Sequence, residues 1–342
     1  MSSFVINRLP KIAEILTNKM VTGEIAEITK LKIIKKIEEL VKKYVPEDPT
    51  KIQNIELALV DLVWIENVVL QYGMSNPEIL KQRTDIYAGF LQRPPSLTLQ
   101  DLVFKNPPTD QRLFSRGETA NWKVFFNYTV RAIEKSIKPV LDQLITLATK
   151  CEYTQENLED LSQKAKLMNQ SVEYISEITR RLPAEEFMKF RKYYTTNTER
   201  NIGGPSALYS ASFPTLDNLL QTQMPEQRYK DELLPQDIQG QNFYYATIED
   251  LRKAQKIRET QGSLINLTLE DKELEKKFHE VFAQILGSMA RFRGRHKGTV
   301  AKLVPEVMVN DKLSTGGITN VAQFLNDAFD KSKQSKTQYD QK

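Results

Sequence analysis

The histidines and the cysteine limit the side-chain chemistry open to this 342-residue chain. It contains two histidines, His279 and His296, and one cysteine, Cys151. A zinc site of ordinary composition takes several Cys and His ligands, and a Cys–His nucleophilic pair needs a reactive thiol beside an imidazole, so we expect neither. A Ser-His-Asp hydrolase is not excluded by these counts, although the chain has no G-x-S-x-G segment. Chemistry that needs a single histidine remains open.

His296 continues a row of apolar side chains along the clearest amphipathic helix of the sequence, which we expect over residues 271–294. The row consists of residues three or four positions apart: Leu274, Phe278, Phe282, Ile285, Met289 and Phe292. His296 follows at the same spacing, so its imidazole should point toward the core. An ordinary core histidine and an axial ligand of a haem iron both fit this position.

The surroundings of His296 in the sequence bear on that choice. Arg291, Arg293 and Arg295 lie within five residues of it, and arginines near the iron would suit the two propionate carboxylates of a haem. A solvent-exposed helix face explains the three arginines equally well. His279 is about 25 Å from His296 along a continuous helix. The two histidines therefore cannot face each other across one haem unless that helix breaks.

The hydrophobic pattern along the chain predicts an all-α protein. Apolar residues recur at helical spacing, and no stretch has the alternation and hairpin turns of a sheet. We expect helices over the following ranges: 25–40, 55–72, 118–148, 154–181, 184–194 and 213–220. Prolines predict an irregular surface segment over 76–110. Residues 221–261 should be largely loop, with possible short helices.

Composition excludes several classes of partner. The chain carries 48 Lys and Arg against 44 Asp and Glu, with no long basic block, so we expect no nucleic acid partner. Its most apolar stretch, residues 55–70, is too short to span a bilayer and contains Glu56, Asp61 and Glu66, so we expect no membrane partner. Sparse cysteine and the lack of an apolar leader at the start predict a cytoplasmic protein. The sequence does not indicate the oligomeric state.

Several motifs in the C-terminal half resemble one known superfamily. Residues 293–296 read Arg-Gly-Arg-His, residues 314–317 read Ser-Thr-Gly-Gly, and Phe-Leu follows at 324–325. Upstream lie an aromatic segment over 187–194, which contains Arg191, a Gly-Gly-Pro-Ser loop at 203–206, and a helical segment over 213–220. In this order they resemble the R-x-x-H, G-T-G-G, F-x-x-x-R and GGSAGQSS patterns of haem-dependent tryptophan and indoleamine 2,3-dioxygenases.

The resemblance implies a fold and a set of site residues. It implies a helical bundle of the indoleamine dioxygenase type with a haem b pocket and long irregular loops. Matching positions make His296 the proximal iron ligand and place Arg191 on the substrate carboxylate, with Thr315 beside the substrate ammonium. The remaining expected contacts are with the haem at Gly203, Gly204, Ser206, Arg293, Gly316 and Gly317, and with the substrate at Trp122, Phe126 and Phe187. The resemblance assigns no certain catalytic residue.

The departures from the pattern affect the expected reaction. No histidine precedes His279, so the chain is nearer to the indoleamine dioxygenase and monodechloroaminopyrrolnitrin synthase branch than to tryptophan dioxygenases, and Ser314 replaces the first glycine of G-T-G-G. We expect an oxygenase that takes O2 and an aromatic amino acid, tryptophan or an indole derivative. A haem enzyme that rearranges or hydroxylates a modified tryptophan or tyrosine, a non-catalytic haem sensor, and a haem-free helical interaction protein remain alternatives.

The expected domain organisation follows the same resemblance. Residues 1–115 should form an N-terminal helical region that contributes to the pocket cover, and residues 116–330 the haem-binding helical domain. A polar tail should occupy residues 331–342.

Overall fold

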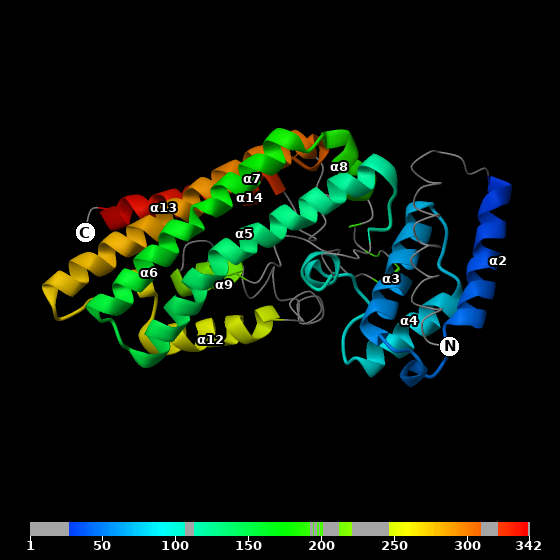
Figure 1. Ribbon diagram of the computed structural model, residues 1–342, viewed down its shortest axis with the longest axis horizontal. Helices are drawn as coiled ribbons and strands as arrows, with labels where there is room; N and C mark the ends of the chain where they lie inside the picture. The colour runs from blue at the N-terminus through cyan, green and yellow to red at the C-terminus, as the bar shows by residue number, and fades with distance from the viewer. Residues whose placement is uncertain are drawn as a thin grey trace.

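The computed structural model is helical throughout the part of the chain that it describes. That part comprises residues 27–106, 113–191, 194, 197, 199–200, 212–220, 246–308 and 321–340. No β-strand occurs among these residues, and the helices pack as bundles (Figure 1). The predicted all-α class is therefore confirmed. None of the described helices is long and apolar enough to cross a membrane.

An N-terminal bundle is built around the apolar helix α3 (Ile55–Gln71). It also contains α2 (Glu27–Tyr44), the short turn η1 (Pro49–Lys51) and α4 (Glu78–Phe90). Twelve consecutive residues of α3 are buried, including Asp61 and Glu66, so this helix is enclosed on all sides rather than amphipathic. Figure 1 shows α2, α3 and α4 together at one end of the molecule.

The prediction of an irregular surface segment over 76–110 was wrong in two respects. Residues 78–90 form α4, because the first prolines after Pro77 stand at 94 and 95, beyond the last helical turn. Residues 97–103 run into the N-terminal core, and a helical turn, η2 (Gln100–Phe104), lies within this stretch. The buried Arg93–Asp101 ion pair, 2.7 Å between Nη2 and Oδ2, closes the loop, and the Asp101 carboxylate also accepts from the Thr98 amide and hydroxyl.

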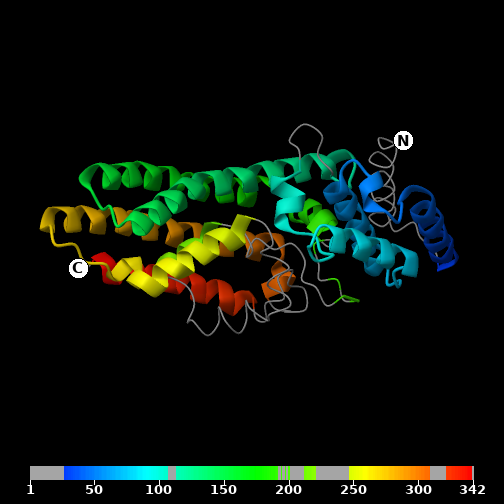
Figure 2. The same cartoon turned by 90° about the horizontal axis from the view of Figure 1, so that it is seen from below.

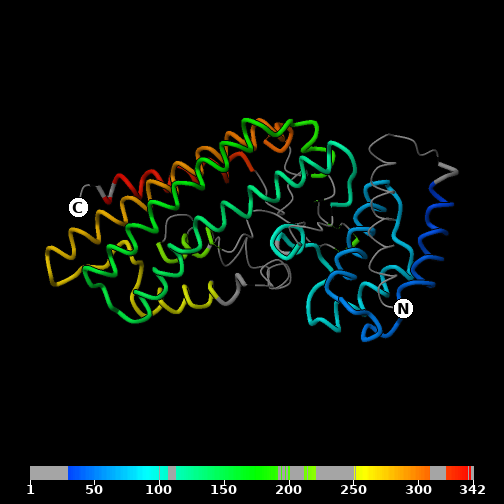
Figure 3. Tube along the Cα trace, in the orientation of Figure 1, coloured from blue at the N-terminus to red at the C-terminus, as the bar shows by residue number. Residues whose placement is uncertain are grey.

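The C-terminal bundle begins with α5 (Gly117–Lys150), which runs from the N-terminal bundle along the rest of the molecule (Figure 3). The other helices of this bundle are α6 (Gln155–Met168), α7 (Gln170–Arg181), α8 (Ala184–Arg191), α9 (Ser212–Leu220), α12 (Ala246–Gln261), η4 (Leu264–Asn266), α13 (Lys272–Leu303), η5 (Pro305–Met308) and α14 (Val321–Asp340). Figure 2 shows α13 running between α6 and α7 on one side and α14 on the other, and these helices are in contact.

Three stretches differ from the helix boundaries expected from the sequence. The helix expected over 154–181 is two helices, α6 and α7, which meet at Asn169. Residues 246–261, expected to be mostly loop, form α12. The helix expected to stop at 294 continues to 303, because Gly294 packs against the ring of Phe329 and so serves a close helix contact instead of ending the helix.

The segment expected to be a polar tail is helical. α14 continues to Asp340, and the side chain of Tyr339 is buried in the C-terminal core. The buried ring of Tyr339 thus holds the last turns of the helix on the bundle. The sequence did not indicate this contact, because the residues around Tyr339 are polar.

Candidate functional site

His296 lies in the interior of the C-terminal bundle, where the apolar row predicted it. α13 is one continuous helix, and the row before His296 is buried at Phe282, Ile285 and Met289. The Phe292 ring lies 6.0 Å from the imidazole centroid at an interplanar angle of 24°. Phe292 also stacks on Phe213 of α9, with centroids 4.4 Å apart. A stack of aromatic rings therefore leads from α9 to the imidazole.

The environment of His296 keeps its imidazole neutral. Burial, together with the positive charge of Arg293, lowers the pKa of His296 to about 4. The side chain nevertheless keeps part of its surface accessible. A neutral imidazole is the protonation state that binds a metal, and a partly accessible one can be reached by a ligand.

Arg293 is held in a buried polar cluster that joins three helices. Its guanidinium donates hydrogen bonds to the Asp217 carboxylate of α9 and to the Ser332 hydroxyl of α14, and all three residues are buried. Arg291 instead donates to Asn169 Oδ1, and Arg295 is exposed. Of the three arginines near His296, only Arg293 belongs to the core.

His279 occupies a separate place on the same helix. Its ring lies 4.7 Å from that of Tyr339 and beside Phe278. Its Nδ1 is buried and has no hydrogen-bond partner among the described residues. Because α13 does not break between them, the two histidines do not face one ligand from opposite sides.

Arg191 ends α8, which packs against the end of α13. Phe187 of α8 and Val300, one helical turn after His296, belong to the same small apolar cluster with Val304 and Val307. Burial lowers the pKa of the Arg191 guanidinium, and Glu306 on η5 opposes this shift. Arg191 is therefore a partly buried cation in the neighbourhood of the last turns of α13, on which His296 lies.

The predicted aromatic contacts form a connected group only in part. The Phe126 and Phe187 rings are 5.4 Å apart, and Phe190 lies 5.8 Å from Phe126. Trp122 packs on the C-terminal core, where its indole nitrogen donates to Glu118 and its ring contacts Phe125. The other predicted contacts lie outside the described residues: Gly203, Gly204, Ser206, Thr315, Gly316 and Gly317.

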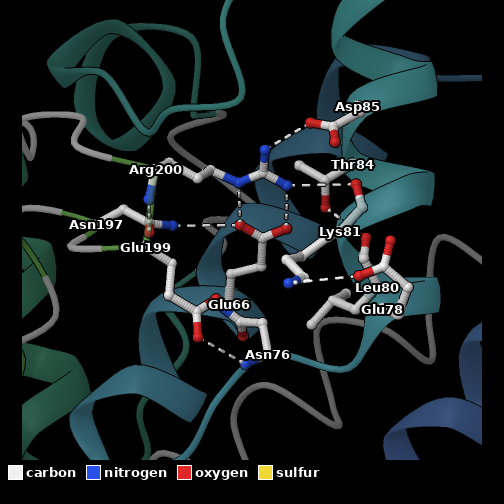
Figure 4. Close-up of polar contacts among 10 residues, drawn as sticks. All are labelled: Glu66, Asn76, Glu78, Leu80, Lys81, Thr84, Asp85, Asn197, Glu199 and Arg200. Atoms are coloured by element: carbon white, nitrogen blue, oxygen red, sulfur yellow. Dashed lines mark hydrogen bonds and ion pairs between the residues drawn. The ribbon is translucent and has the colours of Figure 1, made fainter.

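A second polar cluster, which the sequence did not predict, fixes the chain after α8 onto the N-terminal bundle (Figure 4). The Arg200 guanidinium forks onto the fully buried Glu66, with Nε to Oε2 at 2.7 Å and Nη2 to Oε1 at 2.9 Å. Asn197 donates to the same carboxylate, and Glu199 accepts from Asn76. An acidic residue in an apolar helix was the only sequence signal, and its partner lies 134 positions away.

Comparison with known proteins gives no family: no family model matches the chain, and no curated protein is similar enough to count as a match. Within the described part of the chain, no three His, Cys, Asp or Glu side chains are grouped as metal ligands. The evidence for function therefore lies in the geometry around His296 and in the sequence motifs.

Proposed function

We propose that this protein is a haem-dependent oxygenase that uses O2 to oxidise an aromatic amino acid, tryptophan or an indole derivative, with His296 as the axial ligand. The observation that carries the proposal is the state of His296: an interior, neutral and partly accessible imidazole. An ordinary core histidine is covered by its neighbours, whereas a ligand needs one nitrogen free to bind.

Two of the segments behind the resemblance, residues 213–220 and 293–296, are in contact, which supports the proposal. α9, which carries the segment after the Gly-Gly loop, packs through Phe213 and Asp217 on the part of α13 that carries Arg293 and His296. Two stretches 76 positions apart are thus joined by a buried ion pair. Arg293 is already paired with Asp217, so a haem propionate would share this arginine rather than neutralise it alone.

Arg191 is the proposed partner of the substrate carboxylate. A guanidinium that has lost part of its hydration binds a carboxylate more strongly than an exposed one does, and its fork fits both oxygens. Phe187 lies one helical turn before Arg191 on α8 and packs on Phe126, and the two rings offer apolar faces for an aromatic ring. In this proposal the haem supplies the oxygen chemistry, and these residues orient the amino acid and exclude water.

The first experiment compares absorption spectra of the wild type and His296→Ala, each expressed with a haem precursor, with His279→Ala as the matched control on the same helix. We expect a Soret band in the wild type and in His279→Ala that is lost or shifted in His296→Ala. Equal spectra for the wild type and His296→Ala would exclude His296 as ligand. A colourless wild type with no affinity for added haem would refute the haem proposal and leave a helical interaction protein.

A second experiment separates an oxygenase from a haem sensor. L-Tryptophan is added to the reduced protein under air, and the spectrum and the products are followed. We expect a tryptophan-dependent spectral shift that is at least tenfold weaker in affinity in Arg191→Met, because the carboxylate loses its charged partner. The same measurements are repeated with hydroxylated tryptophan and with tyrosine. If neither the spectrum nor the oxygen consumption responds to any of the three amino acids, the result would favour a haem sensor.

A further inference from the structure

A fully buried lysine lies where the two bundles meet. Lys123 of α5 has no exposed surface, and its ammonium nitrogen lies 4.3 Å from the centroid of the Trp64 ring of α3. Phe114 and Tyr194 complete an aromatic cage, with ring centroids 5.5 and 5.4 Å from the nitrogen. We call these four residues the Lys123 cage. It joins the long helix of the C-terminal bundle to the centre of the N-terminal core.

Lys123 has one hydrogen-bond partner among the residues that the structure describes. Lys123 Nζ donates to the Leu113 carbonyl at 2.7 Å. The buried acidic residues of α3 on either side of Trp64 are Asp61 and Glu66, and neither forms an ion pair with Lys123. Glu66 is paired with Arg200 instead. The Tyr194 hydroxyl oxygen is also buried, and it has no hydrogen-bond partner among the described residues. Within the described part of the chain, a charged amine here is therefore balanced by ring faces and one carbonyl.

The cage is also strained and connected to the candidate site. Phe114 has a left-handed φ of 52°, which non-glycine residues rarely adopt and which persists only where neighbouring contacts fix it. The Tyr194 amide donates to the Arg191 carbonyl at 2.8 Å, so the same turn carries one wall of the cage and the proposed carboxylate partner. A change in the cage would thus reach Arg191 through three residues of chain.

We propose that Lys123 is a proton-operated latch: the uncharged amine keeps the two bundles docked, and a proton on Nζ favours their local separation at the cage. The inference does not rest on the haem proposal. Burial lowers the pKa of Lys123 to about 7, and the ring faces oppose this shift because they stabilise the ammonium. When the cage opens, the amine regains an ordinary pKa of about 10.4. Opening therefore takes up a proton between these two values.

The sign and size of the pH dependence follow from this linkage. From about pH 10 down to about pH 7, each unit should increase the opening equilibrium by up to about tenfold, and below pH 7 the curve should flatten. The measurement is amide hydrogen exchange of residues 113–116 and 194 at pH 9 and pH 7, corrected for the intrinsic rate. We expect protection in the wild type to fall by up to about 100-fold between the two, and not to change in Lys123→Met.

Two controls make the test specific. Lys135→Met removes an exposed lysine from the same helix and should retain the wild-type pH dependence. Amides in the centre of α13 report on the rest of the bundle and should not follow the cage. The proposal is overturned if wild-type protection at the cage is the same at pH 9 and pH 7, a result that needs no variant to fold. It is equally overturned if the pH dependence persists in Lys123→Met.

Discussion

At the scale of single residues, Arg200 and Glu66 show how a buried charge depends on its partner. Glu66 is fully buried in an apolar helix, so Arg200→Met would leave its carboxylate there with the Asn197 amide but without its cationic partner. We expect a loss of about 3–5 kcal/mol in the free energy of unfolding, measured by urea denaturation. Asp85→Asn, which removes an exposed carboxylate from the same arginine, should cost less than about 1 kcal/mol. Equal losses would contradict this account.

Another residue-scale prediction concerns the imidazole of His296. Its pKa in the folded protein is lowered to about 4 from an ordinary value of about 6.5. Between these values the unfolded chain binds more protons, so His296 destabilises the fold progressively as the pH falls from 6.5 to 4. The effect is at most about 3 kcal/mol and is smaller because the ring keeps accessible surface. Unfolding of His296→Gln should lack this part of the pH dependence, whereas His279→Gln should retain it.

At the scale of elements, two glycines of α13 offer a matched pair. A Cβ on Gly298 would meet nothing within 4 Å, whereas a Cβ on Gly294 would lie 3.0 Å from the Phe329 ring of α14. Gly298→Ala should therefore stabilise the protein by up to about 1 kcal/mol through helix propensity. Gly294→Ala should lose that gain to overpacking, which typically costs about 1–3 kcal/mol. Thermal melts of both variants measure these changes. A higher melting temperature for Gly294→Ala than for Gly298→Ala would show that α14 packs differently.

The same helix shows how far the sequence could predict the fold and the site. The apolar row fixed the direction of His296, because a periodicity of 3.6 residues is a local property that neighbours in sequence reveal. The extension of α13 beyond Gly294 was missed, because the glycine is required by Phe329, 35 positions later. The sequence also could not predict that Asp217 pairs with Arg293 in the core. Charged residues are mostly exposed, so each of the two is expected at the surface unless its partner is known.

At the scale of the whole molecule, two apolar cores meet through a few side chains. Residues between 37 and 114, with Phe190 and Tyr194, form the N-terminal core, and residues between 133 and 339 form the C-terminal one. Phe126, Val130 and Phe187 pack against both. The domain boundary at 115–116 inferred from the sequence stays a prediction, because side chains from α5 and α8 belong to the contact on both sides. Cooperative unfolding of the two bundles should depend on these three residues.

Phe126→Ala tests that dependence. Removing the ring should cost about 2–4 kcal/mol and weaken the link between the cores, so that they unfold in separate steps. In a Trp122→Phe background the remaining tryptophan is Trp64, which is fully buried in the N-terminal core and reports on it by fluorescence, while far-UV circular dichroism reports on all helices. We expect the two urea transitions to coincide in the background protein and to separate in Phe126→Ala.

Leu144→Ala, inside the C-terminal core, is the control and should lower both midpoints together. Coincident transitions in Phe126→Ala would mean that the contacts that remain, those of Val130, Phe187 and the Lys123 cage, are enough to make the two bundles one cooperative unit.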